Sequence, residues 1–336
     1  MKNAPRSPHR LTFAGRVGRR LSIIAHNMYL DLNHDHRKTV LLCGSGRSGT
    51  TWLVDVANFD NHYRLMIEPF NRGRVPAVKN FRRRQYLRPF DVDPTYLGPA
   101  TSIFTGAIRD GFIDQLNRRV ISSTRIVKDV GCTLMLGWLR ARFPGMPIIF
   151  VLRHPCAVAA SRTKLGWDDV REDYLGQSDL IADHLAPFAR AIRDAKPGFE
   201  QHVFTWCVEN YIPFRQFEAG DVHLAFYENF CVDPKPALDR LFGFLGRSYD
   251  ERIFARLTRS VVSGRTRGRL RPSAVMSVEA LNEPWRRDVS QADVDRAHEI
   301  LALFGMDKIY DRVGLPDLNA AQAMFAGASS TAAAGP

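Results

Sequence analysis

The stretch Val40–Phe59, VLLCGSGRSGTTWLVDVANF, constrains the fold of this chain more than any other. An apolar run is followed by a glycine-rich turn and then by two threonines and a helical pattern. This order predicts a strand, a turn of the size that holds a phosphate, and a helix that begins near Thr50. The glycines permit positive φ and close approach of the backbone, while the unpaired N–H groups of the first helical turn attract an anion. The sequence therefore predicts an anion site at this turn.

The spacing of the turn is similar to the nucleotide P-loop, GxxxxGK[ST], with one departure. Thr50 stands where the P-loop has its lysine, so the usual contact with the outer phosphates of a nucleoside triphosphate is missing. A P-loop kinase also needs a carboxylate that holds magnesium. We keep a nucleotide kinase as an alternative that Thr50 argues against.

Short β-like runs alternate with helical patterns beyond residue 37, and several of these runs are apolar throughout. Such alternation predicts an α/β, P-loop-like three-layer fold with a central parallel sheet and helices on both faces. Ligands of such sheets bind at the carboxyl ends of the strands. The expected strands are 39–43, 64–67, 125–128, 147–152 and 222–226. The expected helices are 50–59, 107–119, 133–142, 155–164, 180–195, 202–219, 236–246 and 291–304.

The composition divides the chain into a domain over 38–316 and two flanking segments. Residues 1–37 are basic, and their apolar residues recur at helical spacing, so this segment either packs over the domain or lies on an anionic membrane. Residues 317–336 are mostly Ala, Gly and Ser, with no charged residue after Asp317, which predicts a disordered tail. Residues 71–104 are rich in Pro and Arg with weak periodicity, and we expect a surface excursion near the substrate.

The net charge and the cysteines indicate which partners and which cellular compartment suit this chain. The net charge of +12 at pH 7 favours anionic partners, and a basic protein that binds nucleic acid or a membrane surface is the alternative outside enzymology. The five cysteines form no CxxC pair, so we expect reduced core thiols and a cytoplasmic protein, with peripheral membrane contact through residues 1–37 as an option. No HxxxH or CxxC pattern indicates a metal.

The run IIFVLRHPCAVAASR, residues 148–162, predicts a second anion site. Arg153 ends an apolar strand, Pro155 suits the first turn of a helix, and Ser161 lies about two helical turns further on. An arginine at a strand end and a hydroxyl on the adjoining helix form a phosphate clamp. Taken alone, an arginine such as Arg153 more often forms a surface ion pair, and a serine such as Ser161 is more often an ordinary helical residue. Because the glycine-rich turn already predicts one anion site, the interpretation as a second anion site is favoured here.

These two segments resemble the cofactor signatures of the sulfotransferase superfamily, which binds 3′-phosphoadenosine 5′-phosphosulfate (PAPS). A third block, FYENFCVDPKPALDRLFGFLG at 226–246, is similar to another of its motifs, and the resemblance spans about residues 38–313. The RSG of the first turn is typical of the carbohydrate-modifying branch. The resemblance implies PAPS without a metal, a hydroxyl acceptor on a carbohydrate, glycolipid or small metabolite, and no nucleic-acid partner. It also assigns cofactor contacts to Arg47, Ser48, Gly49, Thr50, Thr51, Trp52, Arg153, Ser161, Tyr227, Arg265 and Arg267.

Catalytic roles fall on three residues. Sulfuryl transfer needs neutralisation of the departing phosphate and a base for the attacking hydroxyl. The resemblance places Arg47 and Lys128 at the leaving group, and we expect Glu68, at the end of the second strand, to be the base. The structural alternatives remain open: Glu68 holds a turn or pairs with Arg72, and Lys128 pairs with Asp129.

Overall fold

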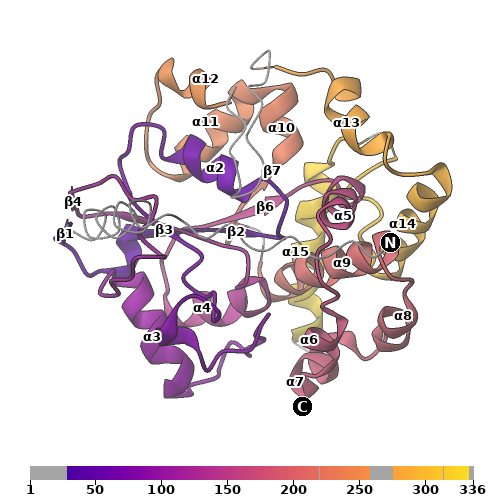
Figure 1. The fold of residues 1–336 in the computed structure, drawn as a ribbon, viewed down its shortest axis with the longest axis horizontal. Coiled ribbons are helices and arrows are strands. Elements are labelled where there is room, and N and C mark those ends of the chain that lie inside the picture. Colours follow the sequence, from indigo (N-terminus) through magenta and orange to yellow (C-terminus); the bar gives the residue numbers. More distant parts are fainter. Residues whose placement is uncertain (1–28, 219, 258–274, 313, 333–336) are drawn as a thin grey trace, which may run out of the picture.

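A five-stranded parallel sheet forms the centre of the protein, with strand order β3-β5-β2-β6-β7 (Figure 1). The structure, a computed structural model, describes residues 29–218, 220–257, 275–312 and 314–332. The central strands are β2 (Thr39–Gly44), β3 (Arg64–Ile67), β5 (Arg125–Asp129), β6 (Ile148–Leu152) and β7 (His223–Phe226). Two short strands, β1 (Leu30–Asp31) and β4 (Ile121–Ser122), form a separate parallel pair. Each predicted strand is present, with ends that differ by one residue at most.

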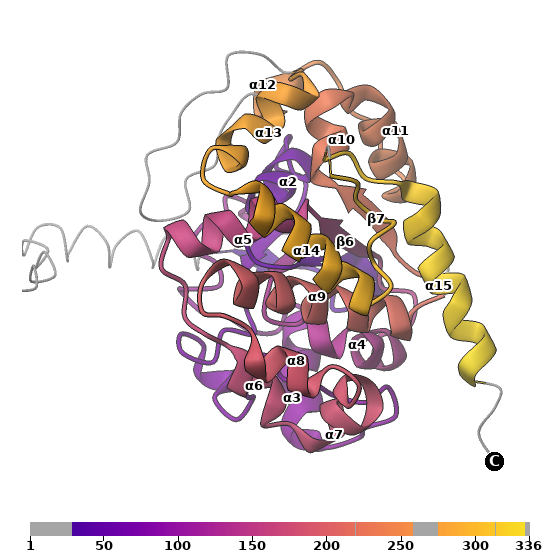
Figure 2. The same ribbon diagram turned by 90° about the vertical axis from the view of Figure 1, so that its right-hand side faces the viewer.

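Alternating side chains of β2 enter two different hydrophobic cores, one on each face of the sheet. Val40 and Leu42 pack with residues of α2, α10, α11 and α12, whereas Leu41 and Cys43 pack with those of α3, α4, α5, α9, α14 and α15. The helices on the two faces appear above and below the sheet in Figure 1, and Figure 2 shows α9 and α14 side by side. This arrangement confirms the predicted three-layer α/β class.

The helices have the following bounds in the structure. They are α2 (Thr50–Ala57), α3 (Pro94–Phe104), α4 (Leu136–Arg142), α5 (Pro155–Lys164), α6 (Arg171–Leu175), α7 (Ser178–Leu180), α8 (Ala189–Asp194), α9 (Phe199–Gln216), α10 (Tyr227–Val232), α11 (Pro234–Phe244), α12 (Arg252–Leu257), α13 (Val278–Arg286), α14 (Gln291–Leu303) and α15 (Leu318–Ala332). Among the described residues, no helix combines the length and the apolar character that crossing a bilayer requires.

Two predictions about local structure were wrong, and a third was right only in part, because the helix predicted at 180–195 is interrupted by a turn at 186–188. Residues 107–119 form turns and not a helix, because the Asp110 carboxylate accepts from the Phe112 N–H (2.8 Å) and the Asp114 side chain is drawn into a buried ion pair. The tail predicted to be disordered forms α15 over Leu318–Ala332. The buried ring of Phe325 packs against Phe214 of α9, with 4.7 Å between ring centroids.

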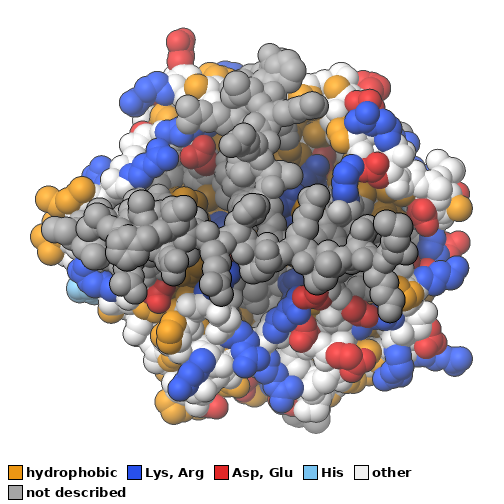
Figure 3. All heavy atoms as spheres, in the orientation of Figure 1, with side chains coloured by type: hydrophobic (Ala, Val, Ile, Leu, Met, Phe, Trp, Pro, Cys, Tyr) orange, Lys and Arg blue, Asp and Glu red, His pale blue; other side chains and the backbone are white. Residues whose placement is uncertain are grey.

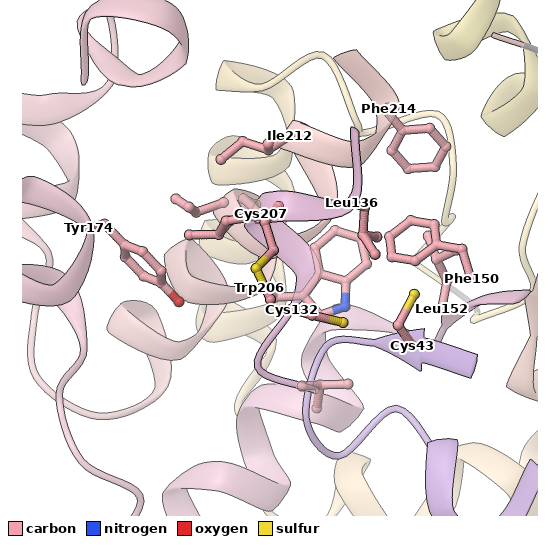
Figure 4. Close-up of a cluster of buried hydrophobic side chains, with 14 of the residues drawn as sticks. Cys43, Cys132, Leu136, Phe150, Leu152, Tyr174, Trp206, Cys207, Ile212 and Phe214 are labelled. Atoms are coloured by element: carbon pink, nitrogen blue, oxygen red, sulfur yellow. The ribbon is translucent and has the colours of Figure 1, made fainter. Parts of the chain in front are cut away.

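The core beneath β2 fixes the start of the glycine-rich turn. Figure 4 shows Cys43 and Phe150 beside Trp206 and Phe214 of α9, and all four are essentially inaccessible to solvent. Gly44 follows Cys43 directly, so the turn emerges from a closely packed layer. Because β2 lies between β5 and β6, and the chain crosses from one side of β2 to the other, the turn sits where doubly wound sheets bind ligands.

The opposite edge of the sheet, where the strands begin, holds a buried ion cluster. Arg64 begins β3 and Arg125 begins β5, and neither is accessible to solvent. The carboxylate of Asp31 pairs with Arg64 at 3.2 Å and with Arg125 at 2.8 Å, and Asp114 pairs with Arg64 at 3.0 Å. Two guanidiniums therefore meet two carboxylates. Asp31 lies in β1, so this part of the predicted N-terminal extension is joined to the domain.

Candidate active site

The glycine-rich turn connects β2 to α2 in the conformation that the sequence predicts. The Ser48 N–H donates to the Ser45 carbonyl at 3.0 Å, and Gly49 precedes α2 with φ of 88°. A Cβ on Gly49 would lie 2.5 Å from Cδ2 of Tyr227, so both the positive φ and the close ring require glycine. Thr50 and Thr51 are the first residues of α2. The N–H groups of this helix therefore begin at the turn.

Arg47 joins the two predicted anion sites. Its φ is 79°, and its Nε donates to Ser161 Oγ of α5 at 2.9 Å. Arg153, at the end of β6, donates from Nη1 to the Arg47 carbonyl at 3.3 Å. Burial, and then the positive charge of Arg153, lowers the pKa of Arg47. The structure thus brings Arg47, Arg153 and Ser161 into one cluster.

The two aromatic residues among the predicted cofactor contacts, Trp52 and Tyr227, lie beside this cluster. The Arg153 guanidinium is stacked 4.4 Å from the centroid of the Tyr227 ring. Trp52 meets Tyr227 edge to face, with 5.3 Å between centroids, and both side chains are buried. In this structure the two rings pack against each other, while Tyr227 also borders Gly49. Arg265 and Arg267, the other predicted contacts, lie outside the described residues.

The turn contains a hydroxyl that lacks a partner in the described part of the protein. Ser48 Oγ is buried, and no donor or acceptor among the described residues reaches it. A buried hydroxyl without a hydrogen bond is unfavourable, and such groups are often completed by a ligand. Arg47, within this turn, and Arg153, next to it, supply positive charge. These residues fit a phosphate-bearing cofactor.

Glu68 and Lys128 form an ion pair at the same edge of the sheet. Lys128 Nζ contacts Glu68 Oε1, and Glu68 Oε2 accepts from the Val130 N–H at 3.2 Å. Lys128 is aligned with Leu42 of β2, so the pair lies next to the strand that leads into the turn. Glu68 has φ of 48°, a left-handed conformation that is uncommon for glutamate and recurs at functional positions.

The partners of this pair differ from the alternatives that the sequence suggested. Lys128 contacts Glu68 rather than Asp129. Asp129 instead accepts from the N–H groups of Phe70 (2.9 Å) and Gly131 (2.6 Å). Burial, followed by the negative charge of Glu68, raises the pKa of Asp129 to about 7.

Several residues that contact the site were missed by the sequence analysis. Arg162 follows Ser161 directly, and its guanidinium contacts the turn from behind together with Glu209 of α9. Glu228 of α10 accepts from the His154 N–H at 2.9 Å and from the Tyr310 hydroxyl at 3.1 Å. Glu209 was recognisable in principle, because it is a carboxylate within a helix whose other positions are largely apolar.

Comparison with known proteins agrees with this geometry. A family model described as "Sulfotransferase family" matches residues 39–251, more than half of the chain. The chain belongs to the sulfotransferase family. The match covers the turn, the Glu68–Lys128 pair, Arg153 and Ser161. No curated protein matches the chain.

Two solved sulfotransferase structures are similar to this sulfotransferase. One is the "Sulfotransferase Domain from the Curacin Biosynthetic Pathway", with 14% identity over 82% of this chain and 97% of that chain, and a TM-score of 0.39. The other is the "Sulfotransferase Domain from the Synechococcus PCC 7002 Olefin Synthase", with 17% identity over 78% and 93%, and a TM-score of 0.38.

Proposed function

We propose that this sulfotransferase moves the sulfuryl group of PAPS to a hydroxyl of a carbohydrate, glycolipid or small metabolite, without a metal. The observation that carries the proposal is the convergence of Arg47, Arg153 and Ser161 on a turn whose Ser48 hydroxyl lacks a partner among the described residues. A donor with two separate phosphate groups matches two adjacent anion sites better than a triphosphate does. The missing lysine at Thr50 has the same implication.

The two anion sites divide the cofactor between them. Arg153 and Ser161 would hold the 3′-phosphate, while Arg47 and the N–H groups of the turn would hold the 5′-phosphosulfate. Trp52 and Tyr227 would border the base, since the aromatic pair lies next to Arg153. Bound PAPS supplies an activated sulfuryl group whose leaving group is a phosphate.

The Glu68–Lys128 pair gives the reaction its proton acceptor and an additional cation. With PAPS bound, the acceptor hydroxyl would form a new O–S bond as the bond between sulfur and the phosphate oxygen breaks, and Glu68 would take the hydroxyl proton. Arg47 and Lys128 stabilise the negative charge that develops on the phosphate. The contact between Lys128 and Glu68 supports these assignments, because it holds a base and a cation side by side at the edge of the turn.

Calorimetric titration of 3′,5′-adenosine bisphosphate against ATP tests the proposal. The protein should bind the bisphosphate at least about tenfold more tightly, and Arg153→Ala should weaken that binding about 100-fold because a buried charge partner is lost. Arg296→Ala is the matched control, since it removes an exposed arginine that pairs with Glu200 on the surface. Preference for ATP, or equal binding by the Arg153 variant, would contradict the proposal. ATP turnover that requires magnesium would favour the kinase instead.

An exposed apolar patch supports a second proposal, peripheral contact with a membrane. Hydrophobic side chains gather at the left edge of Figure 3, where β1 and β4 lie in Figure 1. The patch consists of Leu30, Leu32, Val120 and Ile121, on or next to the paired strands β1 and β4, and each is more than half exposed. Arg118 and Arg119 are exposed beside the patch. Apolar side chains flanked by arginines match an anionic bilayer, which has an apolar interior below charged headgroups, better than they match nucleic acid. We also place the protein in the cytoplasm, because its five cysteines are buried free thiols.

Vesicle co-sedimentation tests the membrane proposal. The double variant Leu30→Gln, Ile121→Gln should bind vesicles that contain phosphatidylserine about tenfold more weakly than the unaltered chain. Leu165→Gln is the control, since Leu165 is a comparably exposed leucine on α5's C-terminal side. Equal binding by the double variant would exclude the patch, and steep salt-dependent binding to nucleic acid that survives substitution of Ser48 and Thr50 would favour the nucleic-acid alternative.

A further inference from the structure

A buried ion cluster lies directly behind the glycine-rich turn and is not used by the proposed chemistry. Its centre is the carboxylate of Glu209, on α9, which is inaccessible to solvent. One carboxylate oxygen, Oε2, accepts hydrogen bonds from Arg162 Nη2 at 2.7 Å and from the Ser45 hydroxyl. The other oxygen, Oε1, accepts a hydrogen bond from the Tyr174 hydroxyl at 3.2 Å and contacts the Arg84 guanidinium. A single side chain therefore joins four separate segments.

Arg162 attaches this cluster to the backbone of the turn. Its Nε and Nη2 donate to the Gly46 carbonyl at 3.1 Å and 2.9 Å, and Nη2 also donates to Ser45 Oγ at 2.8 Å. The preceding residue, Ser161, meets Arg47 on the other side of the same turn. Helix α5 thus holds the turn from two directions through consecutive residues.

Arg84 brings a distant part of the chain to the same carboxylate. It belongs to the excursion 71–104, the segment expected to contact the acceptor, and its side chain is nevertheless 8% exposed. Its φ of 57° is a left-handed conformation, and its carbonyl accepts from Gln177 Nε2 at 2.9 Å. Tyr86 and Leu87, which follow it closely, are buried as well, so this part of the excursion packs on the domain. The left-handed backbone of Arg84 and its buried contact with Glu209 indicate that this contact helps to fix the local structure.

The charges of the cluster do not balance. Two guanidiniums, Arg84 and Arg162, share one carboxylate, and Arg47 is a third cation close by. Burial, followed by the positive charge of Arg84, lowers the pKa of Arg162, and Arg162 Nη1 has no hydrogen-bond partner among the described residues. An anion bound at the turn would offset this surplus, so its binding should stabilise the whole cluster, including Arg84.

We propose that Glu209 and Arg162 are positioning residues that couple the phosphate turn to the excursion 71–104, so that an anion bound at the turn also orders the segment around Arg84. The inference rests on the proposed function for the identity of the anion, an adenosine bisphosphate. Glu209 joins both segments, Arg162 acts on the turn, and Arg84 acts on the excursion. Neither Glu209 nor Arg162 is assigned a contact with the cofactor or the acceptor.

Hydrogen exchange measured by mass spectrometry tests the roles of Glu209 and Arg84 without an activity assay. In the ligand-free protein, Glu209→Gln should raise exchange in peptides that cover 44–51 and 80–88. Asp114→Asn, which weakens the equally buried Arg64 pair at the far edge of the sheet, should leave both peptides unchanged. In the unaltered protein, 3′,5′-adenosine bisphosphate should protect both peptides, and in Arg84→Met it should protect 44–51 alone.

Calorimetry completes the test. Glu209→Gln should weaken binding of 3′,5′-adenosine bisphosphate at least about tenfold, whereas Asp114→Asn should change it by less than about twofold. If the bisphosphate protects only 44–51 in the unaltered protein, the coupling is refuted. If the protein does not bind the bisphosphate at all, the proposed function fails, and the ligand-free exchange of Glu209→Gln still decides the positioning role: unchanged exchange in both peptides refutes it, and raised exchange in both supports it.

Discussion

Two buried arginine clusters occupy opposite edges of the same parallel sheet, and they differ in charge balance. Where the strands begin, Arg64 and Arg125 meet two carboxylates. Where the strands end, Arg84 and Arg162 share the single carboxylate of Glu209, with further cations nearby. Both clusters are removed from solvent, so burial alone does not distinguish them.

The balanced cluster also satisfies its hydrogen bonds. Arg125 donates to Thr39 Oγ1 at 2.9 Å and to the Asp35 carbonyl at 2.8 Å, and no polar side-chain atom of Arg64, Arg125, Asp31 or Asp114 is left without a partner. Near the turn, by contrast, Ser48 Oγ and Arg162 Nη1 have no partner among the described residues. A complete network stabilises a fold, whereas an incomplete and positively charged one has capacity for an anion.

The largest expected effect concerns a balanced ion pair at the site's edge, Glu68 with Lys128. Glu68→Gln removes the proposed base, so kcat for sulfuryl transfer should fall about 10²- to 10⁴-fold. Affinity for 3′,5′-adenosine bisphosphate should stay the same, since the amide keeps the side chain's shape. Steady-state kinetics with PAPS and a panel of hydroxyl acceptors, together with calorimetry, measures both. A variant that loses stability but keeps kcat would make Glu68 a structural partner of Lys128.

The next effect tests whether the balanced cluster acts on stability alone. Arg125→Met leaves the buried Asp31 carboxylate with one partner fewer, and the free energy of unfolding should fall by about 3–5 kcal/mol. Urea denaturation measures this loss. The folded variant should bind 3′,5′-adenosine bisphosphate as the unaltered protein does. Weaker binding that parallels the loss of stability would show that the two edges of the sheet are not independent.

A smaller effect on stability distinguishes the cost of a left-handed backbone from the cost of a steric clash at the turn. Gly49→Ala places a Cβ against the Tyr227 ring at a φ of 88°, whereas Gly166→Ala introduces a Cβ into open space at a φ of 60°. Both substitutions carry the cost of a left-handed residue, and only Gly49→Ala adds a clash, which should lower its melting temperature further by an amount equivalent to about 1–3 kcal/mol. Equal losses would mean that Tyr227 moves aside without cost.

The sequence predicts the parts of this site that depend on local chain order. A glycine turn between a strand and a helix has a local signature, and so has an arginine at the end of an apolar strand. Arg47, Arg153 and Ser161 were therefore found before the structure, and the structure brings them together. The five central strands were predicted for the same reason, since each is a short apolar run between turn signals.

The parts that the sequence did not predict depend on contacts between distant residues. Glu209 and Arg84 are 125 positions apart and meet only because the tertiary fold brings the excursion to α9. Helix α3 was also missed, although Asp93 caps it and Pro94 begins it, because its periodicity is weak. The helix predicted at 107–119 fails because Asp114 is drawn into the ion cluster. The tertiary structure thus contains a helix where the local pattern is weak, and it lacks one where the local pattern predicts it.

The smallest effect uses pH to examine a carboxylate beside the incomplete cluster. Burial raises the pKa of Glu228 from 4.5 to about 6. Because the folded-state pKa lies above the unfolded value, this group's contribution to stability is complete below pH 4.5 and is lost as the pH rises through 6. The total loss is about 2 kcal/mol, of which about 1 kcal/mol falls between pH 5 and 7.5.

Glu228→Gln removes this pH dependence, since glutamine does not ionise. The difference in unfolding free energy between the unaltered protein and the variant should therefore become about 1 kcal/mol less favourable to the unaltered protein from pH 5 to pH 7.5. Urea denaturation at the two pH values measures this change, and Glu172→Gln, at an exposed position on α6, is the control. If the difference is the same at both pH values, Arg153 keeps the Glu228 carboxylate ionised at pH 5. In that case the Glu228 carboxylate offsets the charge of Arg153 already at pH 5, whereas a pKa of about 6 confines this compensation to higher pH. The surplus of positive charge at the incomplete cluster would then be smaller at pH 5 than the comparison of the two clusters implies.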